Sequence, residues 1–345
     1  MNRDETFIKK TLDLAARGLG NVAPNPMVGC VIVKNNKIIS EAYHKQFGEA
    51  HAEVNAIKNL PSDFDFSDCT LYVNLEPCSH YGKTPPCADL IVAKKFKKVV
   101  IGALDPNPQV AGRGMEKLAQ AGIEVTIGVL EKECKELNKR FYTFHQKNRP
   151  YLILKWAQTA DGYISKKPLP VNKIENWVSS EESKELSHLW RSQEQAILIG
   201  FNTAVADDPE LTTRLVQGNN PIRIVLDKNL ELDTKLKVFN NLSHTIVFNS
   251  IKNEIKGKVE YIKIDFEILV PEILKHLYQK NILSVIIEGG TKTHNLFIES
   301  GLWDEARVLF NPTKLFYSGI KAPDLPLNVQ PQKSGVDKVF LLKNS

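Results

Sequence analysis

Two short motifs restrict the fold and chemistry of this chain more than any other feature. The first is His51-Ala52-Glu53, and the second runs from Pro77-Cys78 to Pro86-Cys87. One imidazole and two thiols form the ligand set of a catalytic zinc site that leaves its fourth position to water. A carboxylate two residues after the histidine can move the protons of that water. We therefore predict a Zn2+ site with the ligands His51, Cys78 and Cys87 and with Glu53 as the catalytic acid and base.

The order of these residues is that of the zinc-dependent deaminases, in which His-x-Glu precedes a Pro-Cys-x-x-Cys motif. This chain differs because eight residues, rather than two, lie between Cys78 and Cys87. Residues 51–58 predict a helix, so His51 and Glu53 lie in its first turn and point in different directions. The alternative is an ordinary histidine near two unrelated buried thiols, which Glu53 and the flanking prolines disfavour. His80, within the loop, either touches substrate or is solvated.

The rest of the first half predicts a layered α/β domain. Apolar residues at helical spacing predict a helix that begins after a cap at Asp4 and ends near Gly18. Residues 30–33 and 37–40 predict a hairpin, with Cys30 in the core. The further predicted elements are strands at 70–74, 98–102 and 124–128 and helices at 87–93, 115–121 and 131–144. A polar stretch at 145–150 predicts a domain boundary.

Length and charge narrow the possible functions. The 345 residues suggest about two domains, and the net charge of +5 is not concentrated in a basic tail, so nucleic acid is not an expected partner. No apolar run approaches the length of a membrane span, and no membrane partner is expected. The five cysteines are too few and too scattered for a disulfide framework. We therefore expect a cytoplasmic protein.

The second half predicts another α/β domain. Its expected strands are 151–157, 196–199, 222–226, 245–248 and 284–287, with helices at 180–190 and 271–278. Glu288-Gly289-Gly290 stands between a strand and a helix, where glycines let backbone N–H groups approach a phosphate. A Gly-Gly turn after a strand serves only the fold about as often as it binds a ligand. No Gly-x-Gly-x-x-Gly motif occurs, which disfavours an ordinary dinucleotide-binding unit.

Residues 24–30, 51–53 and above all 77–87 resemble the deaminase domain of the bifunctional riboflavin-biosynthesis deaminase-reductases. The resemblance accounts for the wide cysteine spacing. It implies a cytidine-deaminase-like three-layer domain over residues 1–145, with zinc on His51, Cys78 and Cys87. It also implies that Glu53 is the proton shuttle and that a phosphorylated pyrimidine loses its 2-amino group as ammonia.

Residues 155–157, 161–162, 199–200 and 206–212 resemble the reductase domain of the same family. The resemblance implies a dihydrofolate-reductase-like domain over residues 151–345 that uses NADPH. The implied cofactor contacts are Ala157, Trp177, Thr203, Asp207, Gly290, Thr291, Lys292, Thr293, His294, Asn295 and Leu296. The implied substrate contacts are Arg191, Leu211, Arg214 and Glu288. Without the family pattern, the two arginines would be read as solvated charges.

The chain departs from the family pattern at two positions. Glu175 stands where a serine normally meets the substrate, and Lys228 stands where serine or arginine is more familiar. An acidic side chain at 175 would repel a phosphate but could bind sugar hydroxyls.

The expected function is deamination of a diaminopyrimidine ribosylamine phosphate and NADPH-dependent reduction of its ribosyl group to ribityl. One alternative is a deaminase with a non-catalytic second domain. The other is a nucleic-acid base deaminase, which would need a basic face with aromatic residues. A homo-oligomer is expected.

Overall fold

The computed structural model describes residues 1–79, 85–108, 110–168, 170 and 173–344. Residues 80–84 of the second motif, His80 among them, therefore lie outside the described residues. The chain folds into two compact units, Met1–Asn148 and Arg149–Ser345. Within the described ranges, every helix is too short or too polar to cross a membrane.

The first unit has the sheet order β2-β1-β3-β4-β5. Its strands are β1 (Gly29–Lys34), β2 (Lys37–Tyr43), β3 (Thr70–Leu75), β4 (Lys98–Ala103) and β5 (Glu124–Ile127). Its helices are α1 (Arg3–Ala15), η1 (Ala16–Gly18), α2 (Ala52–Lys58), α3 (Cys87–Ala93), α4 (Arg113–Gln120), α5 (Glu131–Leu137) and α6 (Lys139–Lys147). β1 is antiparallel to β2 and β3, whereas β3, β4 and β5 are parallel.

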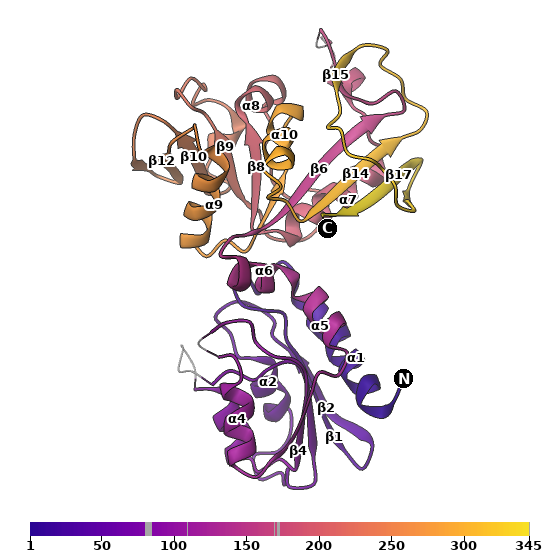
Figure 1. The fold of residues 1–345 in the computed structure, drawn as a ribbon, viewed down its shortest axis with the longest axis vertical. Helices are drawn as coiled ribbons and strands as arrows, with labels where there is room; N and C mark the ends of the chain where they lie inside the picture. The colour runs from indigo at the N-terminus through magenta and orange to yellow at the C-terminus, as the bar shows by residue number, and fades with distance from the viewer. Residues whose placement is uncertain (80–84, 109, 169, 171–172, 345) are drawn as a thin grey trace. The chain divides into compact units, whose positions relative to one another are not determined.

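Helices cover both faces of this sheet. Figure 1 shows α1 and α5 on one side and α2 and α4 on the other. One face of β1 buries Cys30 and Ile32 against Ala56 of α2. The hairpin turn has left-handed backbone at Asn35 and Asn36, with φ of 51° and 62°, as a tight two-residue turn requires. The three-layer prediction and the core position of Cys30 are thus confirmed.

Two helix predictions need correction. The cap of α1 is Asn2, not Asp4, because Asn2 and Glu5 form a reciprocal capping box. The single helix predicted at 131–144 is two helices that meet at Asn138. The buried Asn138 side chain accepts the N–H of Met27 at 2.8 Å and donates to its carbonyl at 2.9 Å, so this residue is fixed to the loop before β1.

The second unit has a sheet in the order β11-β12-β10-β9-β8-β13-β6-β14-β17-β16, and β7 pairs with β15. Its strands are β6 (Tyr151–Thr159), β7 (Tyr163–Lys166), β8 (Ala196–Gly200), β9 (Ile222–Leu226), β10 (Thr245–Asn249), β11 (Glu254–Lys256), β12 (Val259–Lys263), β13 (Ser284–Ile287), β14 (Glu305–Asn311), β15 (Gly319–Lys321), β16 (Gln332–Ser334) and β17 (Asp337–Lys343). Its helices are η2 (Lys173–Asn176), α7 (Glu181–Gln193), α8 (Phe201–Asp207), η3 (Lys237–Phe239), α9 (Leu269–Gln279) and α10 (Thr291–Glu299).

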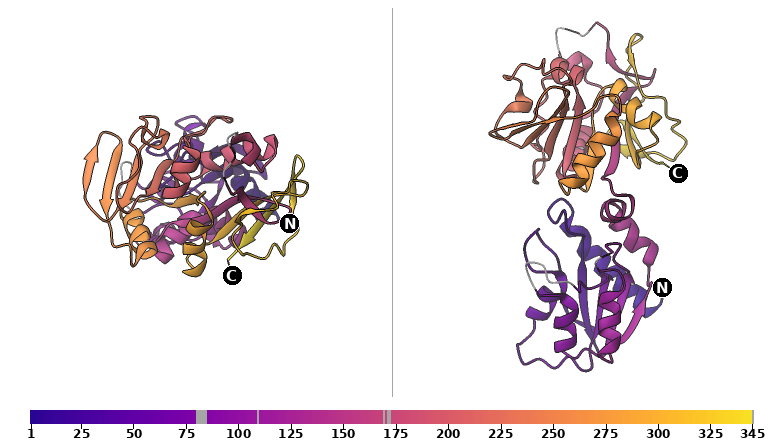
Figure 2. Two further views of the ribbon diagram at one scale, coloured as in Figure 1. Left: turned by 90° about the horizontal axis from the view of Figure 1, so that it is seen from above. Right: turned by 60° about the vertical axis from the view of Figure 1, so that its left-hand side comes forward.

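The middle of this sheet is parallel. In spatial order it consists of β12, β10, β9, β8, β13, β6 and β14. In the left view of Figure 2, the orange β11–β12 edge lies at one end of the sheet and the yellow C-terminal strands lie at the other. β6 is buried on both faces, as expected for a central parallel strand. Leu152 and Leu154 join the core under α9 and α10, whereas Ile153 joins the core under α7 and α8.

Candidate active sites

Three short segments of the first unit bring the predicted zinc ligands together. His51 is the residue before α2, Cys78 follows β3, and Cys87 is the first residue of α3. His51 Nδ1 lies 3.5 Å from Cys78 Sγ and 3.3 Å from Cys87 Sγ, and the three ligand atoms lie within 4.8 Å of one another. Tetrahedral zinc with ordinary Zn–N and Zn–S bonds places such atoms about 3.6 Å apart. The donor set and its spacing fit a zinc ion.

Glu53 adds an independent sign that a ligand belongs here. Its side chain lies in the first turn of α2 and is only 3% exposed. Its Oε2 atom has no hydrogen-bond partner among the described residues. A buried carboxylate oxygen without a partner is costly. A water held beside the three ligands would satisfy it.

The three ligand groups share their protons unevenly. The hydrogen bond with Cys78 and burial raise the pKa of the Cys87 thiol well above its usual range, so zinc binding has to displace protons from Cys87 and from His51. Hydrogen bonds from Cys87 and His51 lower the pKa of the Cys78 thiol to about 4, against the effect of burial. The hydrogen bond with Cys78 raises the pKa of His51 to about 9. Burial raises the pKa of Glu53, although His51 acts in the opposite direction. A raised pKa suits a group that both takes and returns a proton.

Sequence reasoning missed two acidic groups beside this cluster. Asp105 is 9% exposed, and burial, together with the charges of Glu76 and Cys78, raises its pKa to about 7. Glu76 is 4% exposed and its carboxylate accepts backbone N–H groups from the segment that follows β4. The available signal was a glutamate directly after a strand of mostly apolar residues, since a buried charge at such a place needs partners.

The second unit gathers a buried charge cluster at the carboxyl end of β13. Arg191 of α7 donates to both Glu288 carboxylate oxygens, at 3.0 and 2.6 Å, and Lys155 Nζ of β6 lies 3.7 Å away. The charges of Arg191 and Lys155 outweigh burial and lower the pKa of Glu288 to about 2. The structure thus brings the predicted substrate residues Arg191 and Glu288 together and adds Lys155 to them.

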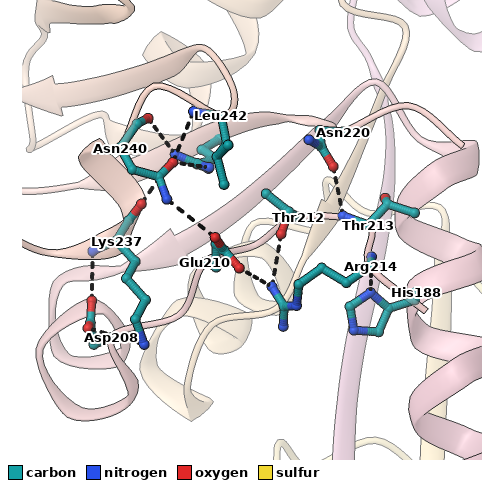
Figure 3. A network of polar contacts seen from close by, with 11 residues as sticks. His188, Asp208, Glu210, Thr212, Thr213, Arg214, Asn220, Lys237, Asn240 and Leu242 are labelled. Atoms are coloured by element: carbon teal, nitrogen blue, oxygen red, sulfur yellow. Dashed lines mark hydrogen bonds and ion pairs between the residues drawn. The ribbon is translucent and has the colours of Figure 1, made fainter. Parts of the chain in front are cut away.

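Arg214 belongs to a separate polar network, drawn in Figure 3. Its guanidinium donates to Glu210 and to Thr212 Oγ1, both at 2.9 Å. Its backbone N–H donates to Nδ1 of the buried His188 at 3.1 Å. Arg214 is about half exposed. A phosphate that binds Arg214 would therefore meet the Glu210 carboxylate as a competitor.

The Gly289-Gly290 turn leads into α10, as predicted. Gly290 is the residue before the helix, and in the part of the chain that the structure describes no side chain caps this N-terminus. The Gly290 N–H donates to Thr203 Oγ1 at 3.1 Å. A Cβ at Gly200 would lie 2.5 Å from Thr293 Oγ1, so β8 and α10 approach closely. An uncapped helix N-terminus beside glycines fits a phosphate group of the cofactor.

Two predicted contact residues have side chains that no ligand can reach. His294 is fully buried, and its ring contacts the carbonyls of Gly290, Lys155 and Ile287. Leu211 is 3% exposed and belongs to the core under α7 and α8. Each side chain packs its own helix or loop against the sheet, so the ligand contacts predicted for these two residues would come from their backbone atoms.

The other predicted cofactor residues lie near the carboxyl ends of β6, β8 and β13 or on the segment after η2. Trp177 is 48% exposed and carries Lys184 Nζ over its ring at 5.0 Å. The half-buried or exposed members of this set are Ala157, Thr203, Asp207, Thr291, Lys292, Asn295 and Leu296. Thr293 is buried against Gly200 and Gly289.

The two departures from the family pattern have defined surroundings. Glu175 lies in η2 with its carboxylate 3.9 Å from Lys166 Nζ, so a cation stands near its charge. Lys228 is exposed and its ammonium lies 5.7 Å from the centre of the Phe266 ring. Both residues belong to the second unit.

Comparison with known proteins gives matches over both units. Residues 1–103 match the model of the cytidine and deoxycytidylate deaminase zinc-binding region, and residues 150–315 match that of the RibD C-terminal domain. The riboflavin biosynthesis protein RibD of Aquifex aeolicus is 40% identical over 328 residues, which cover 93% of this chain and 90% of the relative. RibD of Escherichia coli is 35% identical over 335 residues, 91% of this chain and 89% of the relative.

Solved structures agree with these matches. A diaminohydroxyphosphoribosylaminopyrimidine deaminase/5-amino-6-(5-phosphoribosylamino)uracil reductase from Thermotoga maritima is 38% identical, with a TM-score of 0.89 over 99% of each chain. RibD of Acinetobacter baumannii is 31% identical, with a TM-score of 0.88 over 99% of each chain. The predicted deaminase-like and reductase-like folds are confirmed.

Proposed function

This chain belongs to the RibD family of riboflavin-biosynthesis proteins and is a bifunctional deaminase and reductase that uses zinc and NADPH, and we propose that its two activities occupy the two sites described above. The first site deaminates 2,5-diamino-6-(5-phosphoribosylamino)pyrimidin-4-one. The second site then reduces the ribosyl group, which gives 5-amino-6-(5-phosphoribitylamino)uracil. The observation that carries the proposal is the meeting of His51, Cys78 and Cys87 beside the unpartnered Glu53 oxygen.

In the deaminase step, His51, Cys78 and Cys87 would hold the zinc ion. Zinc in such a site makes water a nucleophile near neutral pH. Glu53 Oε2 accepts the proton of that water and returns it to the nitrogen that leaves as ammonia. Its burial helps because a desolvated carboxylate exchanges a proton more readily near neutral pH than an exposed one does.

In the reductase step, NADPH supplies the hydride. The first turn of α10 would hold its phosphates with backbone N–H groups, and Gly290, whose own N–H donates to Thr203 Oγ1, leaves room for them. Glu288 fixes the Arg191 guanidinium in place through two hydrogen bonds, so that a planar donor surface faces the substrate. Arg214 binds the substrate phosphate. Lys166 offsets the charge of Glu175, which leaves that carboxylate able to accept hydrogen bonds from sugar hydroxyls.

Membership of the family removes the support for the two alternatives, a nucleic-acid base deaminase and a non-catalytic second domain. The match of residues 150–315 to the RibD C-terminal domain is the finding that weighs against both.

The proposal is tested on the purified wild-type protein by metal analysis and by two assays. We expect about one zinc per chain, ammonia release from the diaminopyrimidine phosphate, and NADPH oxidation only after deamination or with the deaminated intermediate supplied. Ammonia release from protein stripped of zinc would contradict the assignment of the first site. Absence of NADPH oxidation with the supplied intermediate would contradict the assignment of the second.

We also propose that the protein acts in the cytoplasm and as a homo-oligomer. None of the five cysteines forms a disulfide, which suits a reducing compartment. The edge strand β11 exposes Ile255 at 74%, an apolar residue that a second copy could cover. Light scattering after size-exclusion chromatography measures the oligomeric state, and a monomer at micromolar concentration would contradict the second part.

A further inference from the structure

The buried Glu76 carboxylate accepts hydrogen bonds from four backbone N–H groups. Glu76 lies between the end of β3 and the zinc ligand Cys78, and it is 4% exposed. Its Oε2 atom accepts from Asp105 and Gly112, both at 3.1 Å. Its Oε1 atom accepts from Gly114 at 2.9 Å and from Met115 at 3.2 Å. The donors all belong to the segment that connects β4 to α4 and to the first turn of α4.

This connecting segment is packed tightly against the motif that carries Cys78. A Cβ at Gly114 would lie 2.2 Å from the Pro77 carbonyl oxygen, so only glycine allows the approach. At the other end of the segment, the buried Asp105 carboxyl lies close enough to Cys78 for the thiolate charge to raise its pKa. The Glu76 N–H also donates to the Ala103 carbonyl at 2.9 Å. The described parts of the segment, residues 105–108 and 110–115, therefore lie beside the stretch of chain that carries Cys78.

We propose that Glu76 is a positioning residue of the deaminase, which fixes residues 105–108 and 110–115 as a wall against which the pyrimidine phosphate binds. This inference rests on the proposed function of the first site. Glu76 points its carboxylate at backbone N–H groups, and the three ligand atoms contact one another rather than Glu76. Glu76 therefore acts on the position of the backbone segment beside the ligands. Its loss should affect substrate binding more than zinc binding or the chemical step.

The test is Glu76→Gln, which keeps the size of the side chain but replaces one acceptor oxygen with an NH2 group. That NH2 would face two N–H donors. We expect the KM for deamination to rise at least about tenfold, kcat to change less than about threefold, and zinc content and reductase activity to stay at wild-type values. Hydrogen exchange should show faster exchange in peptides spanning residues 110–116 but not in those spanning β3.

The matched control is Asp65→Asn. The exposed Asp65 also accepts a backbone N–H, that of Ser67 at 2.9 Å, but far from the ligands in its own turn. No change in KM is expected for it. A Glu76→Gln enzyme with the wild-type KM would overturn the inference, and so would one that loses zinc, because Glu76 would then act through Cys78.

A second variant changes the segment that Glu76 holds rather than Glu76 itself. Gly114→Ala places a methyl group against the Pro77 carbonyl and should raise the same KM, whereas an unchanged KM contradicts the inference even if Glu76→Gln does not fold. Turnover by the wild type, measured first, tests the proposed function by itself. The ratio of variant to wild type tests only the role of Glu76.

Discussion

The two candidate sites differ in how far their polar groups are satisfied by the chain itself. In the first unit, Glu53 Oε2 is buried without a partner among the described residues, and three ligand atoms converge on one small volume. In the second unit, Glu288 already holds Arg191 with two hydrogen bonds and lies near Lys155. The first site is arranged for a ligand that completes it, whereas the second is arranged around its own ion pairs.

This difference predicts different modes of failure. Substitutions at the first site should remove the metal or the proton transfer and leave the fold intact, because the missing partner is a ligand. Substitutions in the Arg191–Glu288 pair of the second site should also weaken folding, because the missing partner is another buried side chain.

The largest expected effect is that of Cys87→Ser. A serine hydroxyl is a poor replacement for a thiolate ligand of zinc. The variant should therefore lose both its bound zinc and its ability to release ammonia, while it continues to reduce the supplied intermediate. Metal analysis and the two assays measure this. Cys69→Ala is the control, because Cys69 is equally buried but lies in the core away from the ligands. Full zinc occupancy with normal ammonia release in Cys87→Ser would disprove the ligand assignment.

Glu53→Gln should lower deamination by about 10²–10⁴-fold, the usual contribution of a positioned acid and base. Zinc should remain bound, since the three ligands are untouched, and reduction of supplied intermediate should be unchanged. Parallel assays of ammonia release and NADPH oxidation check this separation. Equal losses in both assays would show that the two sites are not independent.

Local pattern predicted the first sheet and the middle of the second. Apolar spacing located β1 to β5 in the first unit and β6, β8, β9, β10 and β13 in the second, whereas β14 and the strands nearer the two edges, β11, β12, β16 and β17, were not predicted. His51, Cys78 and Cys87 stood out as candidate ligands because their chemistry and order are unusual together. The break at Asn138 was not predictable, because its cause is a pair of hydrogen bonds to Met27, more than a hundred residues away in sequence.

The second site was harder to predict for the same reason. The pairing of Arg191 with Glu288 depends on the tertiary packing of α7 beside β13, which no local pattern encodes. The burial of His294 and Leu211 also depends on which side of α10 and of the loop faces the sheet. A family resemblance predicts which residue types stand at which positions of the chain. It does not predict whether a given side chain points toward the ligand or into the core.

Glu288→Gln tests the charge pairing of the second unit. Folding lowers the pKa of Glu288 from 4.5 to about 2. The carboxylate therefore stabilises the fold above pH 4.5, by about 3 kcal/mol, and this contribution disappears as the pH falls from about 4.5 to about 2. The stability difference between wild type and Glu288→Gln should be largest at pH 7 and shrink over that range.

Denaturation followed by tryptophan fluorescence measures this difference, because all four tryptophans lie in the second unit. Glu254→Gln is the control, since Glu254 pairs with Lys252 on the exposed edge. A pH-independent difference for Glu288→Gln would mean that its charge does not stabilise the unit.

Gly290→Val separates cofactor binding from folding. A Cβ at Gly290 would meet only Thr203 Oγ1, at 3.7 Å, so the chain itself has room for it. We expect the dissociation constant of NADPH to rise at least about tenfold, which is about 1.4 kcal/mol, with little change in stability or deamination. Gly289→Ala is the counterpart, because its Cβ would lie 2.6 Å from Thr293 Cβ and should lower stability. Calorimetric titration with NADPH distinguishes them, and unaltered affinity in Gly290→Val would exclude the turn as a phosphate site.

The smallest expected effect is that of Glu210→Gln. This variant tests whether the Glu210 carboxylate competes with the substrate phosphate for Arg214. The Glu210 carboxylate accepts a hydrogen bond from the half-exposed Arg214 guanidinium at 2.9 Å and another from the Asn240 side-chain amide at 3.4 Å (Figure 3). An exposed ion pair contributes about 0.2–1 kcal/mol, so removing the competing charge should lower the KM of the reductase substrate by no more than about fivefold. The effect should fade as salt is added, because salt screens exposed charges.

Asp208→Asn is the matched control for Glu210→Gln. Asp208 pairs with Lys237 at 3.6 Å in the same network but does not touch Arg214, and asparagine tolerates its left-handed backbone, with φ of 43°. The KM should stay at the wild-type value in this variant. If Glu210→Gln instead raised the KM, Glu210 would be orienting Arg214 rather than competing for it. The second site would then resemble the first, with each buried or half-buried carboxylate serving the ligand.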